Sequence, residues 1–145
     1  MRVLMAVDDS GFAECVLRAV VAGIRHENTD VFVLNVLQPV DTLPPPEMAQ
    51  GYAPELEEEM QPARAFVERI AAELRRAGFA ALTGVRIGDA ANTIVDIAAE
   101  WRADLIAVGS HGPRSIHDFL LGSVAESVAR RAGCSVTIVR APAGN

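Results

Sequence analysis

The chain has 145 residues, a formal net charge of −6, and a composition that is half hydrophobic. This length is typical of one domain with a real core, so we expect a single domain over residues 1–145. An acidic chain without a basic block argues against a nucleic-acid partner. No run of about 18 residues is both apolar and uncharged, which argues against a membrane span.

The N-terminal segment and the cysteines favour a cytoplasmic protein. The opening apolar run is short and ends in Asp8 and Asp9, unlike a secretory signal peptide. Cys15 and Cys134 are far apart in the sequence and lie in apolar contexts. They are therefore expected to be buried thiols rather than a disulfide or a metal pair.

Short apolar runs alternate with amphipathic segments along the chain. Runs rich in apolar and β-branched residues predict strands over 2–7, 30–37, 80–87, 104–109 and 134–140. Apolar residues at helical spacing predict helices over 10–26, 56–78, 88–102 and 123–132. Asp89 is the expected N-cap of the third helix, and Gly78 and Gly133 are the expected stops of the second and fourth. Pro62 predicts a kink or a helix start.

Five strands alternating with four helices predict the α/β class, with a parallel sheet covered on both faces. Right-handed crossovers leave few topologies, and a doubly wound order of 3-2-1-4-5 is the most economical. Such sheets bind ligands at the carboxyl ends of the strands, where the winding direction changes. The segment "VDDS" leaves the first strand there, and a glycine-containing loop leaves the fourth.

That loop, "GSHGPRSIHDFLLGS", covers residues 109–123 and contains three glycines. Gly109 would let a ligand approach the strand end, and Gly112 would allow a turn with positive φ. Gly122 and Ser123 precede a helix, whose unpaired N–H groups and dipole favour an anion. These features indicate a phosphate cradle. The alternative is that the glycines are ordinary turn residues and that Ser123 forms a capping box with Glu126.

The spacing of these residues resembles a known nucleotide-binding signature. The loop is not a Walker motif, because the chain contains no lysine. Gly109, Gly112, Gly122 and Ser123 match G-x2-G-x9-G-[ST], the signature of the universal stress protein family. The opening "VLMAVDDS" and the stretch "GDAANTIVDIAAEWRADLIAVGSHG" are similar to other parts of that family. The resemblance therefore covers the chain nearly end to end.

The resemblance implies that the pocket holds an adenine nucleotide, usually ATP, together with a divalent ion such as Mg²⁺. No side chain would hold the metal as a dedicated ligand, although Asp8 or Ser123 would lie near it. Asp8 would hold the ribose or lie near the ion. Family members that lack the full motif tend not to bind ATP, so the intact motif favours binding.

The same resemblance assigns the walls of the pocket. Ala6 and Val7 would line the base together with Val36, and Val108 and Gly109 would border the sugar.

The phosphates would be surrounded by residues of the glycine loop and the following helix start, namely Gly112, Gly122, Ser123 and the amide of Val124. Two further loop side chains have open roles. His111 would contact phosphate or fill a turn position. Arg114 is the only cation of the loop, and it would contact phosphate or remain solvated.

These observations predict a nucleotide-dependent regulatory module in stress response or signalling, with at most weak ATP hydrolysis. One alternative is a slow ATPase or phosphate-transfer protein. Phosphoryl transfer requires a positioned nucleophile and a cation, and only His111 and Arg114 are candidates for assisting it. Another alternative is a structural dimer with a vestigial pocket, against which the intact glycine set argues. The protein partner is not indicated.

Two further segments carry predictions. Residues 38–54 form a connection longer than most ordered loops, which predicts a lid or a disordered segment over the base pocket. The last strand is an edge, and "CSVTIV" (134–139) contains no proline or charge. We expect it to pair antiparallel with its own copy in a homodimer, as members of the family commonly do. The alternative is a monomer in which Arg140 and the "APAGN" tail cover the edge.

Overall fold

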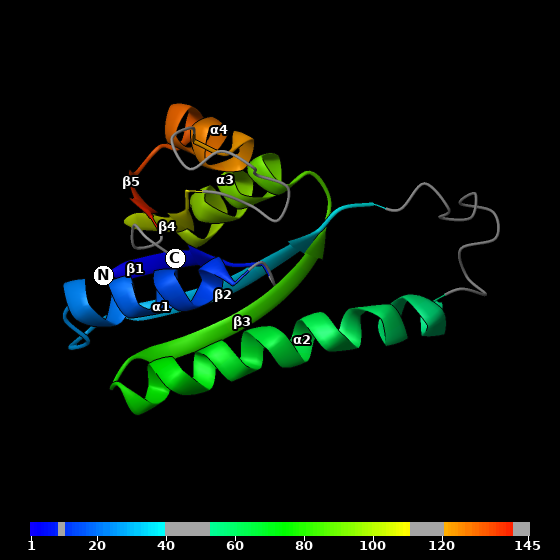
Figure 1. Ribbon diagram of the computed structural model, residues 1–145, viewed down its shortest axis with the longest axis horizontal. Coiled ribbons are helices and arrows are strands. Elements are labelled where there is room, and N and C mark those ends of the chain that lie inside the picture. Colours follow the sequence, from blue (N-terminus) through cyan, green and yellow to red (C-terminus); the bar gives the residue numbers. More distant parts are fainter. Residues whose placement is uncertain (9–10, 40–52, 111–120, 141–145) are drawn as a thin grey trace.

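The computed structural model describes residues 1–8, 11–39, 53–110 and 121–140, and of residues 53–57 only the backbone. Nine elements alternate along this part of the chain (Figure 1). In chain order they are β1 (Arg2–Ala6), α1 (Phe12–Gly23), β2 (Asp30–Leu37), α2 (Ala53–Arg76), β3 (Ala80–Ile87), α3 (Ala90–Trp101), β4 (Leu105–Gly109), α4 (Ser123–Arg131) and β5 (Ser135–Val139).

The five strands form one parallel sheet in the order β3-β2-β1-β4-β5. β1 lies in the centre, where Val3 is paired with Val31 of β2 on one side and with Leu105 of β4 on the other. The chain therefore winds from β1 toward one edge and then crosses back to β4 to reach the other edge. This confirms the predicted α/β class, the strand order and the position of the switch point.

Side chains alternate across the sheet and build one core on each face. Val3 and Met5 of β1 pack with α1 and α2, whereas Leu4 packs with α3 and α4. Figure 1 shows these two pairs of helices on opposite sides of the sheet. All three β1 side chains are fully buried, and burial of each contributes about 1.5–3 kcal/mol. The central strand thus anchors both layers.

The boundaries of α2 differ from the prediction. The helix begins at Ala53, so Pro62 lies inside it rather than at its start. The predicted long connection is correspondingly shorter, since its last two residues (53 and 54) are helical. The predicted lid otherwise falls mainly on residues 40–52, which lie outside the described residues.

The two predicted glycine stops behave differently. Gly78 has a φ of +98°, and the Phe79 N–H donates to the Leu74 carbonyl at 3.0 Å, which closes the end of α2 as expected. The stop assigned to Gly133 was wrong in mechanism. α4 ends at Arg131, and its C-cap residue Ala132 is extended, with φ −64° and ψ 139°. No left-handed glycine cap is therefore needed there.

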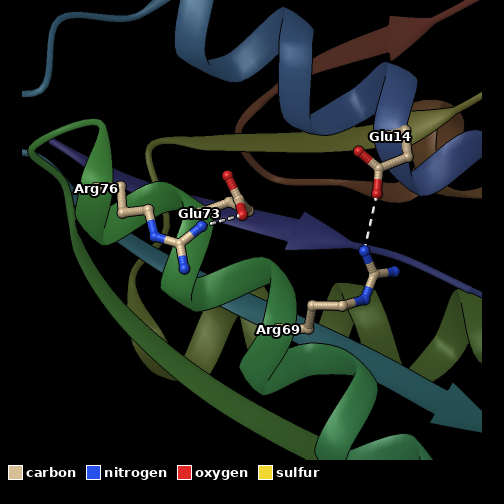
Figure 2. Close-up of polar contacts among 4 residues, drawn as sticks. All are labelled: Glu14, Arg69, Glu73 and Arg76. Carbon is tan, nitrogen blue, oxygen red and sulfur yellow. Dashed lines mark hydrogen bonds and ion pairs between the residues drawn. The ribbon is translucent and has the colours of Figure 1, made fainter.

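Exposed side chains of α2 form ion pairs. Arg69 bonds Glu14 of α1 at 3.0 Å, and Arg76 bonds Glu73 at 2.6 Å within α2 (Figure 2). All four side chains are substantially exposed, and such pairs contribute at most about 1 kcal/mol each. The position of α1 relative to α2 is therefore set mainly by the shared core.

Neither cysteine forms a disulfide. Cys15 and Cys134 are half-buried free thiols. Burial, assisted by the Asp104 carboxylate, raises the pKa of the Cys134 thiol.

No described helix is both long and apolar enough to cross a membrane.

Replacing Gly78 by alanine is expected to destabilise the protein by more than about 1 kcal/mol, because an L-residue is strained at positive φ. The new Cβ would also lie 2.9 Å from Nδ1 of His26, so that ring must move. Gly23→Ala is the matched control, since Gly23 ends α1 with open space around it. It should be neutral or stabilising by up to about 1 kcal/mol. Urea denaturation measures both values, and equal stability of the two variants would contradict the assigned role of Gly78.

Candidate functional site

The carboxyl ends of β1 and β4 lie side by side at the switch point. Met5 of β1 is paired with Ala107 of β4. The chain leaves β1 through the half-buried Asp8 and leaves β4 at Gly109. The two segments expected to form the site therefore begin at neighbouring points of the sheet.

Two hydrogen bonds close the base of the glycine loop. The N–H of Ser110 donates to the Val139 carbonyl of β5 at 2.8 Å, and the N–H of Gly122 donates to the Ser110 carbonyl at 2.7 Å. Ser110 is only 1% exposed. Gly122 is therefore bonded to Ser110, the neighbour of Gly109, although the loop separates Gly109 and Gly122 in sequence. Residues 111–120 of the loop, including the predicted His111, Gly112 and Arg114, lie outside the described residues.

The N-terminus of α4 has no side-chain cap in the described part of the chain. Gly122 is the N-cap residue, with φ −63° and ψ 154°, and Ser123 is already the first residue of the helix. The capping box considered for Ser123 and Glu126 was therefore wrong, and Glu126 instead pairs with Arg130 at 2.8 Å. A helix start of this kind presents backbone N–H groups and a positive dipole end to an anion.

The N-terminus of α3 provides a contrast within the same sheet. Its predicted cap is confirmed, because the Asp89 carboxylate accepts a hydrogen bond from the N–H of Asn92 at 2.9 Å. A carboxylate at this position disfavours an anionic ligand. The glycine loop therefore leads into α4, whose first N–H groups have no side-chain cap among the described residues, whereas those of α3 are capped by Asp89.

Four of the predicted pocket residues gather on the α3/α4 side of the sheet. They come from three strands and one helix but belong to a single apolar cluster: Ala6, Val36, Val108 and Val124. Val108 is buried beneath the surface, and the other three are half-buried. This cluster provides an apolar wall between the end of β2 and the start of α4.

Val7 departs from this arrangement. Its side chain packs in the opposite core with α1 and α2, so only its backbone can border the site. That backbone is fully engaged, because its N–H donates to the Leu34 carbonyl at 2.9 Å and its carbonyl accepts from Asn35 at 2.7 Å.

Asn35 is the residue that sequence reasoning missed. Its Nδ2 donates to the Val7 carbonyl, its side chain is 6% exposed, and its Oδ1 is buried without a partner among the described residues. An unpaired buried amide oxygen costs about 1–3 kcal/mol. The available signal was a single polar residue inside the apolar strand "DVFVLNVL". Asn35 fixes the point at which the chain turns from β1 into Asp8.

The geometry combines an open helix start, a glycine at a strand end, a carboxylate and an apolar wall. The helix start can bind an anion, and the glycine lets a backbone or sugar approach closely. The carboxylate can accept hydrogen bonds from hydroxyl groups, and the apolar wall can pack against a flat ring. A ligand that carries all of these features would use the whole arrangement.

Comparison with known proteins places the chain among relatives. It is 31% identical to the universal stress protein Sll1388 of Synechocystis sp. over 150 residues, which cover 96% of this chain and 97% of the relative. The structure of protein MJ0577 of Methanocaldococcus jannaschii superimposes with a TM-score of 0.81 at 28% identity, covering 99% of this chain and 97% of that one. A universal stress protein in complex with cAMP gives a TM-score of 0.66 at 25% identity, covering 96% and 95%.

The sequence model of the universal stress protein family matches residues 1–140. This match and the end-to-end similarity to Sll1388 agree with the doubly wound sheet and the closed glycine loop. The chain belongs to the universal stress protein family.

Proposed function

We propose that this protein binds an adenine nucleotide, with ATP as its ligand, at the carboxyl ends of β1 and β4. The observation that carries the proposal is the hydrogen-bonded base of the glycine loop, which brings Gly109 to the open N-terminus of α4. The related structure that contains cAMP supports an adenine nucleotide in this family. The intact loop signature favours a ligand with several phosphates.

Each part of the site has a matching part of the nucleotide. The backbone N–H groups at Ser123 and Val124 would bind phosphate oxygens, since they lie in the first turn of α4. The base would lie against Ala6 and Val36 of the apolar wall. The Asp8 carboxylate would accept hydrogen bonds from the ribose hydroxyls. The roles proposed for His111 and Arg114 remain predictions.

The residues of the site also fit a magnesium ion that accompanies the phosphates. Mg²⁺ prefers oxygen ligands and is usually held by one or two protein oxygens together with phosphate groups. The Asp8 carboxylate and the Ser123 hydroxyl are oxygen donors at the two sides of the crevice. When bound, the ion would neutralise phosphate charge, which a chain without lysine does little to offset.

The same groups favour binding over rapid hydrolysis. Backbone N–H groups stabilise phosphate charge but accept no proton from an attacking water. Fast phosphoryl transfer also requires a positioned base and a cation at the transferred group. We therefore assign the protein the role of a regulatory module in a stress response, whose state changes when nucleotide binds.

A homodimer formed through β5 would allow nucleotide binding to affect the association of two copies of the chain. Within the part of the chain that the structure describes, β5 pairs only with β4. The Val139 carbonyl accepts from Ser110, so Val139 and, by strand alternation, Thr137 direct their backbone groups toward β4. Val136 and Ile138 therefore direct theirs outward. The bond between Ser110 and Val139 also connects the base of the glycine loop to this edge.

ATP binding is tested with Gly122→Val. The φ and ψ of Gly122 are accessible to any residue, so the fold should remain intact while a branched side chain blocks the approach of phosphate. Calorimetry should show a loss of ATP affinity of more than about tenfold, or 1.4 kcal/mol. Gly133→Val, placed after α4 in open space, is the control and should bind normally. Unchanged affinity in the Gly122 variant, with magnesium present, would refute the site.

Slow turnover is tested by steady-state phosphate release from the purified protein. We expect a rate far below the median enzyme value of about 10 per second. Release at such a rate, persisting through repeated purification and abolished by Gly122→Val, would identify the protein as an ATPase instead.

The dimer is tested with Val136→Pro. The N–H of Val136 points away from β4, so proline removes a donor from the outer edge without breaking the β4–β5 ladder. Sedimentation should show a wild-type dimer and a folded monomeric variant. Thr137→Pro is the contrasting variant, because it breaks the internal ladder and should lower the melting temperature more. A monomeric wild-type protein at micromolar concentration would exclude the dimer.

A further inference from the structure

β3 forms the second edge of the sheet and has features that favour pairing with a strand of another chain. It is eight residues long, and among the described strands it pairs only with β2. Its Leu82 and Ile87 side chains are 53% and 42% exposed. A long edge strand with exposed apolar side chains is a recognised site of unwanted pairing between chains.

The register defines which backbone groups of β3 point outward. The N–H of Gly88 donates to the Leu37 carbonyl of β2 at 2.9 Å. Because backbone groups alternate along a strand, the even-numbered residues of β3 face β2. Ala81, Thr83 and Val85 therefore direct their N–H and carbonyl groups away from the sheet.

Two arginine side chains donate hydrogen bonds to backbone carbonyls on this outer edge. Arg75, from the last turn of α2, donates through Nη2 to the Ala81 carbonyl at 2.9 Å. Arg86 donates through Nη1 to the Val85 carbonyl at 3.1 Å. These two carbonyls are outward-facing groups that an incoming strand would need as acceptors.

A carboxylate holds the first arginine in place. Arg75 donates through Nη1 to Glu68 at 2.5 Å, and this bond is the main reason that the pKa of Glu68 lies below its ordinary value. The Thr83 side chain lowers the pKa of Glu68 further, by a smaller effect. Arg75 thus reaches the strand edge as part of a connected group rather than as a lone surface side chain.

Gly84 provides the space for the second arginine. A Cβ at this position would lie 3.3 Å from Nη1 of Arg86 and 2.8 Å from the Phe32 ring. The missing side chain therefore allows Arg86 to lie back along the strand toward the Val85 carbonyl.

We propose that Arg75 and Arg86 cap the outer edge of β3 and thereby prevent it from pairing with a strand of a second copy of this chain. A guanidinium has only donors, so it satisfies the outward carbonyls and presents no acceptor to an incoming N–H. Charged side chains on an edge are a known means of blocking such pairing. In the described part of β5, no side chain donates to the outward carbonyls of Val136 and Ile138, so the two edges are not equivalent.

The test is the double variant Arg75→Ala/Arg86→Ala, examined by sedimentation over a range of micromolar concentrations. Its weight-average mass should at least double relative to the wild type as concentration rises. The substitutions remove two positive charges from a chain that already carries −6, so general repulsion between copies would increase. Charge alone therefore predicts the opposite result.

Arg69→Ala/Arg76→Ala is the matched control. Both arginines lie on α2, as Arg75 does, and form ion pairs with Glu14 and Glu73 (Figure 2). Neither donates to a strand carbonyl among the described residues. The control changes the charge equally and should sediment like the wild type.

Adding Thr83→Pro to the double variant locates the association. The N–H of Thr83 points outward, so proline removes a donor needed for pairing without breaking the β2–β3 ladder. The mass should return to the wild-type value. Should circular dichroism show that the double variant is unfolded, Arg86→Ala alone carries the test, because it leaves the Arg75–Glu68 bond intact. Variants that keep the wild-type mass, or association that persists with Thr83→Pro, would overturn the proposal.

Discussion

The backbone of Ser110 is the contact on which the arrangement of the site depends. Its N–H binds the end of β5 and its carbonyl binds Gly122 at the start of α4. Buried backbone groups are costly when unpaired, so this almost fully buried residue strongly favours a closed loop base. Without these two bonds, β4 and α4 would still share a core, because Val108 lies in the same apolar cluster as Ala125 and Val128, but the ends of the loop would not be fixed to each other. The two ends of the glycine signature therefore meet at this residue.

Asn35 provides the corresponding constraint on the other side of the crevice. It holds the Val7 carbonyl from β2, so the turn toward Asp8 starts from a fixed backbone position. Its Oδ1 has no partner among the residues that the structure describes, a cost that an apolar side chain of similar size would avoid. This cost lies beside the switch point, where the bond from Asn35 to the Val7 carbonyl fixes the exit of β1. The hydrogen bonds of Ser110 and Asn35 together hold the ends of β1 and β4 in place. A ligand that binds there would not have to order these strand ends.

The sequence predicted the features that depend on local patterns or on general rules of topology. Continuous apolar runs located the strands, and the crossover rule left few topologies, among which the most economical order was the observed one. The start of α4 at Ser123 was predicted correctly, but the capping box considered for Ser123 was wrong because S-x-x-E does not reveal which residue is the N-cap. A shift of one residue gave that position to Gly122. Asn35 escaped prediction because its partner, Val7, is distant in sequence.

The topology also explains why the two edges of the sheet require different treatment. β5 lies beside β4, and its last residue is bonded to the base of the glycine loop. β3 is separated from β4 by two strands and has no such connection. A partner at β5 would therefore contact the strand that is bonded to the proposed nucleotide site, whereas a partner at β3 would have no such contact. In the proposed arrangement, the arginines that cap β3 would restrict assembly to the edge that is connected to that site.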